Sequence, residues 1–221
     1  MLKIIYKLSI ILIVLTVSLQ AGLSENQKIS TSMEILKSSH IKIPQNILKN
    51  AKAIAIIPNL KRGGLLFGGS YGSGILSIKQ PDGIWSDPSF ITFRNASFGL
   101  QAGVESTDAI IIFETRRSLD GIADGKVTIS FNAGIAAVKN GQYMSRKTDA
   151  NLAADIYVYG KSSGIFVGLM SIGSGNLYIN DESNDEYYDT LVNTESLLSG
   201  YLQSKKQQVV NFQKLLLKYT R

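Results

Sequence analysis

Residues 63–74 decide the fold of this chain, and their sequence is Gly63-Gly64-Leu65-Leu66-Phe67-Gly68-Gly69-Ser70-Tyr71-Gly72-Ser73-Gly74. Glycine alternates here with apolar and aromatic residues, which is typical of strands that another backbone approaches closely. A phosphate-binding loop would need a Gly-Lys-Ser/Thr ending, or a dinucleotide-type turn before a helix, and neither follows. The stretch therefore predicts tightly packed β-structure rather than a nucleotide site.

The β-pattern continues after this stretch. Residues 63–180 are rich in glycine, β-branched and aromatic residues, with turn signals at short intervals, as at 81–83, 124–125 and 140–141. A short buried strand is expected over 53–57, ended by Pro58. Further strands are predicted over 64–70, 73–79, 89–94, 97–104, 108–114, 127–138, 155–160, 164–171 and 174–179. The expected fold class is α+β, with a mostly antiparallel core that is either a bent sheet or barrel-like.

Helices are expected at both ends of the β-region. Ser24 and Gln27 have capping-box spacing at the start of a helix over 24–39, and Pro44 suits the first turn of a short helix ending near residue 52. Residues 117–123 predict one helical turn, and 182–189 the start of another helix. Over 195–219, apolar residues fall on one broad face of a basic amphipathic helix. No repeat or linker divides the chain, so we expect one domain.

The N-terminus has the features of an export signal. Lys3 and Lys7 are followed by the uncharged apolar run Leu8–Val17 and then by small residues that suit cleavage after Ala21. The apolar run is shorter than the ~20 residues of a spanning helix, although an uncleaved membrane anchor stays the alternative. The predicted organisation is a signal peptide over 1–21, a domain over 22–198 and a basic C-terminal helix over 199–221. The mature protein is expected to be periplasmic or secreted, with membrane association as an alternative.

The distribution of charge argues against nucleic-acid binding. The chain has a formal net charge of +6, but residues 22–195 hold 16 basic and 17 acidic residues, a net charge of −1. The excess positive charge after the signal segment lies in Lys205, Lys206, Lys214, Lys218 and Arg221. A near-neutral body with a cationic tail does not have the broad basic face of a nucleic-acid-binding protein.

Residue types with catalytic or metal-binding roles are scarce. The chain has no cysteine, which excludes disulfides and thiol catalysis, and its one histidine, His40, lies between two predicted helices. The acidic residues of 181–186 lack the pattern of a calcium loop and suit a solvated helix start better. We expect no enzymatic activity, no cofactor and no metal.

Several basic residues lie next to predicted strands. If the sheet closes, some of them could meet at one rim and bind phosphate headgroups, while the alternative is a scattered, solvated surface. These candidates are Lys61, Arg62, Arg94, Arg116, Arg117 and Lys161. The basic C-terminal helix offers a similar choice, because it could lie on an anionic membrane or pack its apolar face against the sheet.

An ordered series of short motifs gives the chain a family resemblance. The series begins with residues 53–58, continues through the glycine-rich stretch and residues 81–91, and ends with a tyrosine pair. Its members include Gly63, Gly64, Gly72, Gly74, Trp85, Pro88, Gly99, Gln101, Gly103, Asp108, Gly164, Phe166, Gly168, Tyr187 and Tyr188. Over roughly residues 30–198 the chain resembles the SYLF domain family, whose members usually have glycine where Asp189 follows the tyrosine pair.

The resemblance implies binding to membrane lipid, and in fungal members binding to actin as well. For an exported member we expect a non-enzymatic protein of a bacterial cell envelope that binds anionic phospholipid through the basic rim and apolar β-surface. No actin partner is expected outside the cytoplasm. The alternative is a structural or adhesive envelope module that binds a protein partner. Trp85 and Pro88 are expected to anchor a turn against the core.

Overall fold

The computed structural model describes residues 22–38, 42–122, 127–132, 142–148, 154–168 and 171–221. The helices are α2 (Glu25–Lys37), α3 (Gln45–Asn50), the 3-10 turn η1 (Arg117–Leu119), α4 (Asp181–Tyr188), α5 (Thr194–Leu198) and α6 (Gln207–Tyr219). The strands are β1 (Ala53–Ile78), β2 (Ser89–Phe113), β3 (Val127–Asn132), β4 (Gln142–Thr148), β5 (Ala154–Gly168) and β6 (Ser171–Ile179). The export-signal segment and His40 lie outside the described residues, so the predictions about them stay predictions.

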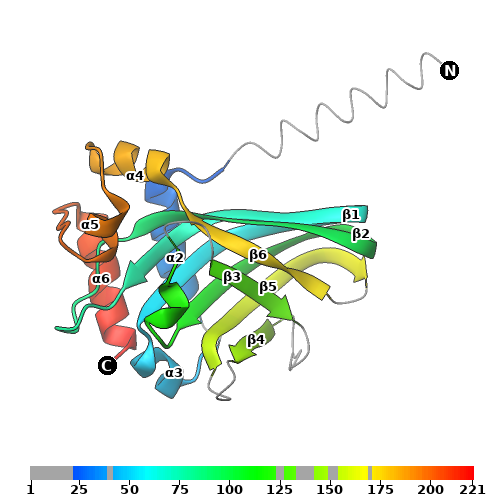
Figure 1. The fold of residues 1–221 in the computed structure, drawn as a ribbon, viewed down its shortest axis with the longest axis horizontal. Coiled ribbons are helices and arrows are strands. Elements are labelled where there is room, and N and C mark those ends of the chain that lie inside the picture. The colour runs from blue at the N-terminus through cyan, green and yellow to red at the C-terminus, as the bar shows by residue number, and fades with distance from the viewer. Residues whose placement is uncertain (1–21, 39–41, 123–126, 133–141, 149–153, 169–170) are drawn as a thin grey trace, which may run out of the picture.

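One six-stranded antiparallel sheet forms the centre of the protein (Figure 1). Its long first hairpin pairs β1 with β2 from Ala53↔Phe113 to Leu76↔Ser89. The other edge of β2 pairs with β6 and then with β5, which gives the order β3-β6-β2-β5-β4. Within the described residues this pairing does not close. The α+β class is confirmed, and of the two predicted forms of the core the bent, open sheet is the one present.

The strand that was predicted to end at Pro58 instead continues to Ile78. The register of β1 against β2 shifts between Ile57 and Leu60, and Asn59 adopts a positive φ of 49°. The N–H of Asn59 donates to the Asp108 Oδ1 at 3.0 Å rather than to a ladder carbonyl. Proline has no N–H to offer, so a bulge is a position inside a strand that tolerates it. The prediction was wrong because this bulge depends on a residue far along the chain.

The glycine-rich stretch lets β1 fold back onto itself. A Cβ added at Gly74 would lie 2.0 Å from the backbone oxygen of Ile56, and one at Gly72 would lie 2.7 Å from the Ile57 side chain. The later part of β1 therefore passes directly over its beginning, at a distance that only glycine permits. This crossing is the close backbone approach predicted from residues 63–74, and it bends the hairpin.

The two faces of the sheet are both buried in this region. Ala53, Ala55 and Ile57 point into one apolar cluster inside the curved sheet, whereas Ile54 and Ile56 point into a second cluster under the helices. Helices α2 and α6 cover that second face and pack against each other (Figure 1). Burial on both faces explains why residues 53–57 are continuously apolar rather than alternating.

The N-terminal helix begins as its capping box predicts. The Gln27 N–H donates to the Ser24 hydroxyl at 3.4 Å, and the Ser24 N–H donates to the Gln27 side-chain oxygen at 2.9 Å. This reciprocal pair satisfies donors that the first helical turn leaves free. Helix α2 is thereby fixed by residues that are local in sequence.

The predicted C-terminal helix over 195–219 is two helices, α5 and α6. They are separated by residues 199–206, in which Gly200 has a positive φ of 77°. The amphipathic face of α6 packs on the core, where Val209, Phe212 and Leu216 are fully buried. No helix within the described residues combines the length and apolarity needed to cross a bilayer.

Candidate functional site

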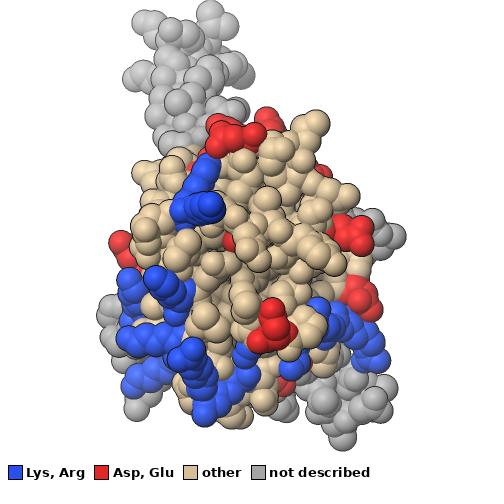
Figure 2. All heavy atoms as spheres, turned by 90° about the vertical axis from the view of Figure 1, so that its left-hand side faces the viewer, with Lys and Arg blue, Asp and Glu red and all other residues tan. Residues whose placement is uncertain are grey.

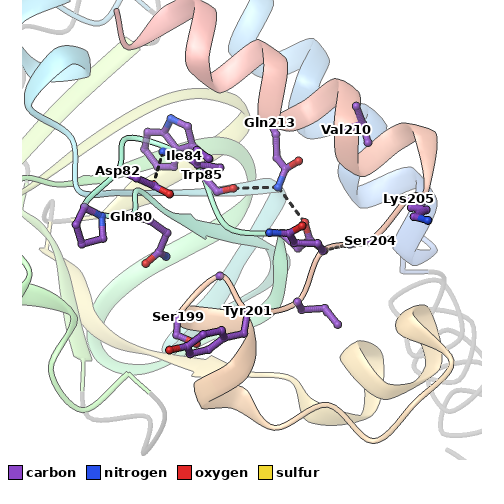
Figure 3. A pocket seen from close by; sticks show the side chains of 15 residues that line it. Gln80, Asp82, Ile84, Trp85, Ser199, Tyr201, Ser204, Lys205, Val210 and Gln213 are labelled. Atoms are coloured by element: carbon purple, nitrogen blue, oxygen red, sulfur yellow. Dashed lines mark hydrogen bonds between the residues drawn. The ribbon is translucent and has the colours of Figure 1, made fainter.

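A cavity of about 800 Å³ lies between the turn that joins β1 to β2, the segment 199–205 and helix α6 (Figure 3). The turn contains Pro81-Asp82-Gly83, where Gly83 has a positive φ of 87° and its N–H donates to the Gln80 carbonyl at 2.9 Å. The Asp82 Oδ1 accepts the Ile84 N–H at 2.9 Å. These local bonds hold Ile84 out at the mouth of the cavity.

Trp85 joins this turn to the C-terminal helix. Its side chain is 1% exposed, and its indole Nε1 donates to the Thr220 hydroxyl at 3.3 Å. The Trp85 carbonyl accepts from the Gln213 Nε2 at 2.9 Å. The tryptophan therefore anchors the turn against the core, which agrees with the role expected from the sequence.

Asp87 is a buried carboxylate at the base of the cavity. Its Oδ2 accepts the Ser204 N–H at 2.6 Å, and its Oδ1 accepts from the Gln213 Nε2 at 2.9 Å (Figure 3). Burial disfavours the charged form and raises the pKa of Asp87 to about 6, although both hydrogen bonds oppose the shift. Asp87 thus ties the segment 199–206 and helix α6 to the β1–β2 turn.

The rim of the cavity carries exposed apolar side chains. Ile84, on the β1–β2 turn, is 56% exposed, and Tyr201, in the segment 199–205, is 86% exposed. The Gln80 Nε2 donates to the Leu198 carbonyl at 3.0 Å, and this bond holds the end of α5 beside the turn. Large apolar side chains held in water around a hollow are typical of a binding surface.

The tyrosine pair secures α4 near the cavity. The Tyr188 hydroxyl donates to the Pro88 carbonyl at 2.7 Å, and the Tyr187 ring packs edge-on against Phe90 with centroids 5.0 Å apart. The Lys206 ammonium lies 4.3 Å from the Tyr187 ring centroid and also contacts the Asp189 carboxylate at 3.1 Å. Both tyrosines therefore hold the helical end together, and neither points into the cavity.

Asp189 occupies a position that favours glycine. It is the C-cap of α4 and has a left-handed φ of 56°. Glycine reaches this conformation without strain, whereas an aspartate at the same position adopts it at some cost.

The six predicted basic residues are placed at several points of the sheet. Lys61 lies opposite Ser106 and Arg62 opposite Glu105 on one side of β2, and Lys161 lies opposite Asp108 on the other. These three residues face neighbouring positions on β2, whereas the other three basic residues lie elsewhere. Arg94 lies opposite Tyr71 near the start of β2, whereas Arg116 and Arg117 follow the end of that strand.

Arg94 has a shallow hollow of its own. A cavity of about 390 Å³ is lined by Arg94, Asn95, Asn176 and Tyr178 among others, and the Arg94 guanidinium lies 5.8 Å from the Tyr71 ring centroid. Tyr71 and Tyr178 are 55% and 38% exposed. The Arg94 guanidinium thus lies near two exposed aromatic side chains, of which Tyr178 lines the hollow.

The remaining motif residues meet across one strand pair. Gln101 lies opposite Gly168, Gly103 opposite Phe166, and Glu105 opposite Gly164 in the β2–β5 ladder. The side chains of Gln101 and Phe166, and the surroundings of Gly99, lie outside what the structure describes. Gly64 lies opposite Gly103 on the β1 side of the same ladder.

The acidic residues 181–186 form the first turns of α4 rather than a metal site. The Asp181 carboxylate accepts from the Thr194 hydroxyl at 2.9 Å, and Asp185 accepts the Val192 N–H at 2.6 Å. Within the described ranges, no three acidic or histidine side chains are placed to share a metal ion. These carboxylates hold the chain that follows α4.

Comparison with known proteins gives the family. Residues 94–219 match the family described as "Ysc84: Las17-binding protein actin regulator". The chain belongs to the Ysc84 family. It is 34% identical over 161 residues to LAS seventeen-binding protein 3 and to Protein YSC84, both of Saccharomyces cerevisiae. It is 31% identical over 159 residues to the SH3 domain-containing YSC84-like protein 1 of Bos taurus.

The alignments with these three relatives each cover 72% of this chain but only 35%, 34% and 46% of the relatives themselves. The chain thus spans about a third to a half of the relatives' length. No solved structure gave a significant match. The resemblance to the SYLF (Ysc84) domain is confirmed. The activities of the full-length relatives are not assigned to this chain on that basis.

The expectation of no actin partner was wrong. The family description names a Las17-binding protein and actin regulator, and one yeast relative is named LAS seventeen-binding protein 3. That expectation rested on the export signal alone, and the signal carries no information about what the folded surface recognises. The comparisons favour a protein partner over the lipid that we expected first.

The central residue of the cavity, Asp87, was not singled out from the sequence. It stands inside the motif that contains Trp85 and Pro88, so the motif was a usable signal. Its partners Ser204 and Gln213 lie more than a hundred residues away and belong to no motif. Ile84 and Tyr201 were missed for the same reason, because exposure on a common rim is a tertiary property.

Proposed function

We propose that this chain is a non-catalytic protein-binding module that docks a protein partner in the cavity between the β1–β2 turn and α6. The exposed apolar rim carries the proposal: Ile84 and Tyr201 stand in water on a scaffold fixed by Trp85 and Asp87. Interfaces draw much of their binding energy from a few such apolar or aromatic anchors in pockets. The family description and the name of LAS seventeen-binding protein 3 support a protein partner, because both record binding to Las17.

Filamentous actin and Las17 are the partners to test first, by co-sedimentation and by pull-down with the purified protein. We expect at least one to bind, and we expect Ile84→Ser or Tyr201→Ser to weaken binding about tenfold or more, as loss of an interface anchor does. Leu191→Ser is the matched control, because Leu191 is 90% exposed but does not line the cavity. Binding of neither partner, or equal weakening by the control, would contradict the proposal.

Binding of anionic phospholipid is the second candidate, and the Arg94 hollow favours it. The Arg94 guanidinium, which forms no ion pair within the described residues, lies near the exposed Tyr71 and Tyr178. This combination suits the boundary between headgroups and acyl chains, where side chains with an apolar body and a polar tip gather. Liposome co-sedimentation at matched protein concentrations tests it. Loss of binding in Arg94→Gln but not in Lys61→Gln would support this candidate, and no binding by the unchanged protein would reject it.

We also propose that the protein is exported, on the strength of residues 1–21. Intact-mass analysis of the protein recovered outside the cytoplasm tests this. A mass that lacks the first 21 residues is expected, and recovery only from the cytoplasm would contradict export.

A further inference from the structure

Basic residues from four separate parts of the chain come close together at the end of the protein where α3 and the C-terminus of α6 lie. Figure 2 shows lysine and arginine gathered over the lower part of the face that carries α6, with most acidic residues above them. We call this the basic surface and define it by Lys52, Lys79, Arg116, Lys218 and Arg221. Four of the five are exposed and Lys79 is half-buried.

Hydrogen bonds bring these segments together. The Lys79 N–H donates to the Lys52 carbonyl at 2.8 Å, and the Arg116 guanidinium donates to the Lys79 carbonyl at 2.7 Å. On the α6 side, the Gln45 side chain of α3 donates to the carbonyl of Arg221 at 3.1 Å. The basic surface therefore forms only when the chain folds, because its residues are far apart in the sequence.

The charge of the basic surface is not balanced locally. Within the described residues, none of its five side chains forms an ion pair. Glu114 follows β2 close to this surface, but it is partly buried and accepts a hydrogen bond from the Asn50 side chain. Like charges held together repel one another, and a partner with negative charge relieves that repulsion.

The basic surface borders the cavity. The Lys79 ammonium lies 5.9 Å from the centroid of the Trp85 ring, and Trp85 itself lines the cavity. Thr220, which accepts from the Trp85 indole, is the residue before Arg221. The buried Trp85 side chain thus lies between the cavity and Lys79, so a segment bound in the cavity would have the basic surface as its near neighbour.

From this continuity we infer that the partner's docking segment is an acidic polypeptide, whose apolar residues enter the cavity while its carboxylates lie on the basic surface. The inference rests on the proposed function and adds the chemistry of the partner. A polypeptide fits better than a membrane surface, because the apolar face of α6 is fully buried in the core and offers nothing for insertion. The cavity also takes individual side chains, which a flat bilayer does not present.

Fluorescence anisotropy with a labelled peptide tests the inference on the purified protein. The probe has a Leu-Phe pair flanked on each side by three glutamates, and its control has lysines in place of the glutamates. We expect the acidic probe to bind and the basic probe not to bind, with affinity falling as salt is raised from 50 to 300 mM, since salt screens exposed charges. Combined Lys52→Gln, Lys79→Gln and Lys218→Gln substitutions are expected to weaken binding about tenfold.

A second triple variant removes the same charge from the sheet: Lys61→Gln, Arg94→Gln and Lys161→Gln. It is expected to bind the acidic probe as the unchanged protein does. Equal weakening by both triple variants, or equal binding of both probes, would overturn the inference. So would binding of phosphatidylserine vesicles through the basic surface without binding of the acidic peptide.

The peptide test also separates this inference from the proposed function. If Ile84→Ser leaves actin and Las17 binding intact while the Lys52, Lys79 and Lys218 variant loses the acidic peptide, the cavity proposal fails and acidic recognition stands. If the acidic peptide fails but Ile84→Ser still abolishes partner binding, the partner is protein but not acidic.

Discussion

The contribution of Asp87 to the stability of the folded protein falls as the pH rises through the weakly acidic range. Burial raises the pKa of Asp87 to about 6 in the folded protein, from 3.8 for an unperturbed aspartate. The folded state therefore holds this proton more tightly than the unfolded state does. Its contribution to stability is complete below pH 3.8 and is lost as the pH rises through 6. One pKa unit corresponds to about 1.4 kcal/mol, so the loss between pH 4.5 and pH 8 is about 2 kcal/mol.

Urea unfolding of the protein and of Asp87→Asn at pH 4.5 and pH 8 measures this contribution. Asparagine does not titrate and can accept only one of the two hydrogen bonds from Ser204 and Gln213. The stability difference between protein and variant should therefore move by about 2 kcal/mol in favour of the variant from the lower to the higher pH. Asp82→Asn, on the exposed side of the same turn, controls for loss of a carboxyl group. A difference that stays constant, or that moves toward the unsubstituted protein, would refute the reasoning.

Three further substitutions test the packing that shapes the site. Gly74→Ala places a methyl group 2.0 Å from the Ile56 oxygen, so we expect a loss of at least about 3 kcal/mol in thermal or urea unfolding. Gly22→Ala has open space around its new Cβ and should change little. Phe212→Ala empties a fully buried position on α6, which should cost about 3–5 kcal/mol in the same assay. Tyr188→Phe removes the hydroxyl that donates to the Pro88 carbonyl, and about 1 kcal/mol of stability should be lost with it; no loss would show that this bond does not secure α4.

Local signals predicted the elements that depend on neighbouring residues. The Ser24–Gln27 capping box placed the start of α2, and the glycines of residues 63–74 predicted the close approach that bends β1. The strand end predicted at Pro58 was wrong because the bulge there is completed by Asp108, about fifty residues away. One C-terminal helix was predicted in place of two for a similar reason, since the break at Gly200 is held by bonds from Asp87 and Gln80.

The candidate site was harder to predict than the fold. The motif with Trp85 and Pro88 pointed to the correct turn, but its partners lie on segments that only the folded chain brings near. The six basic residues chosen from the sequence were selected for lying beside strands, and the register of those strands decides where each one projects. The basic surface that borders the cavity includes only Arg116 from that set.

Site-specific photo-cross-linking tests most directly whether this chain docks a protein at the cavity. A photoreactive amino acid would replace Tyr201 in the full chain, and in parallel Leu191, in the cells that produce the protein. Our account predicts a discrete protein adduct from position 201 that is absent from position 191 and that disappears when Ile84→Ser is added. No protein adduct from position 201, or the same adducts from both positions, would contradict it.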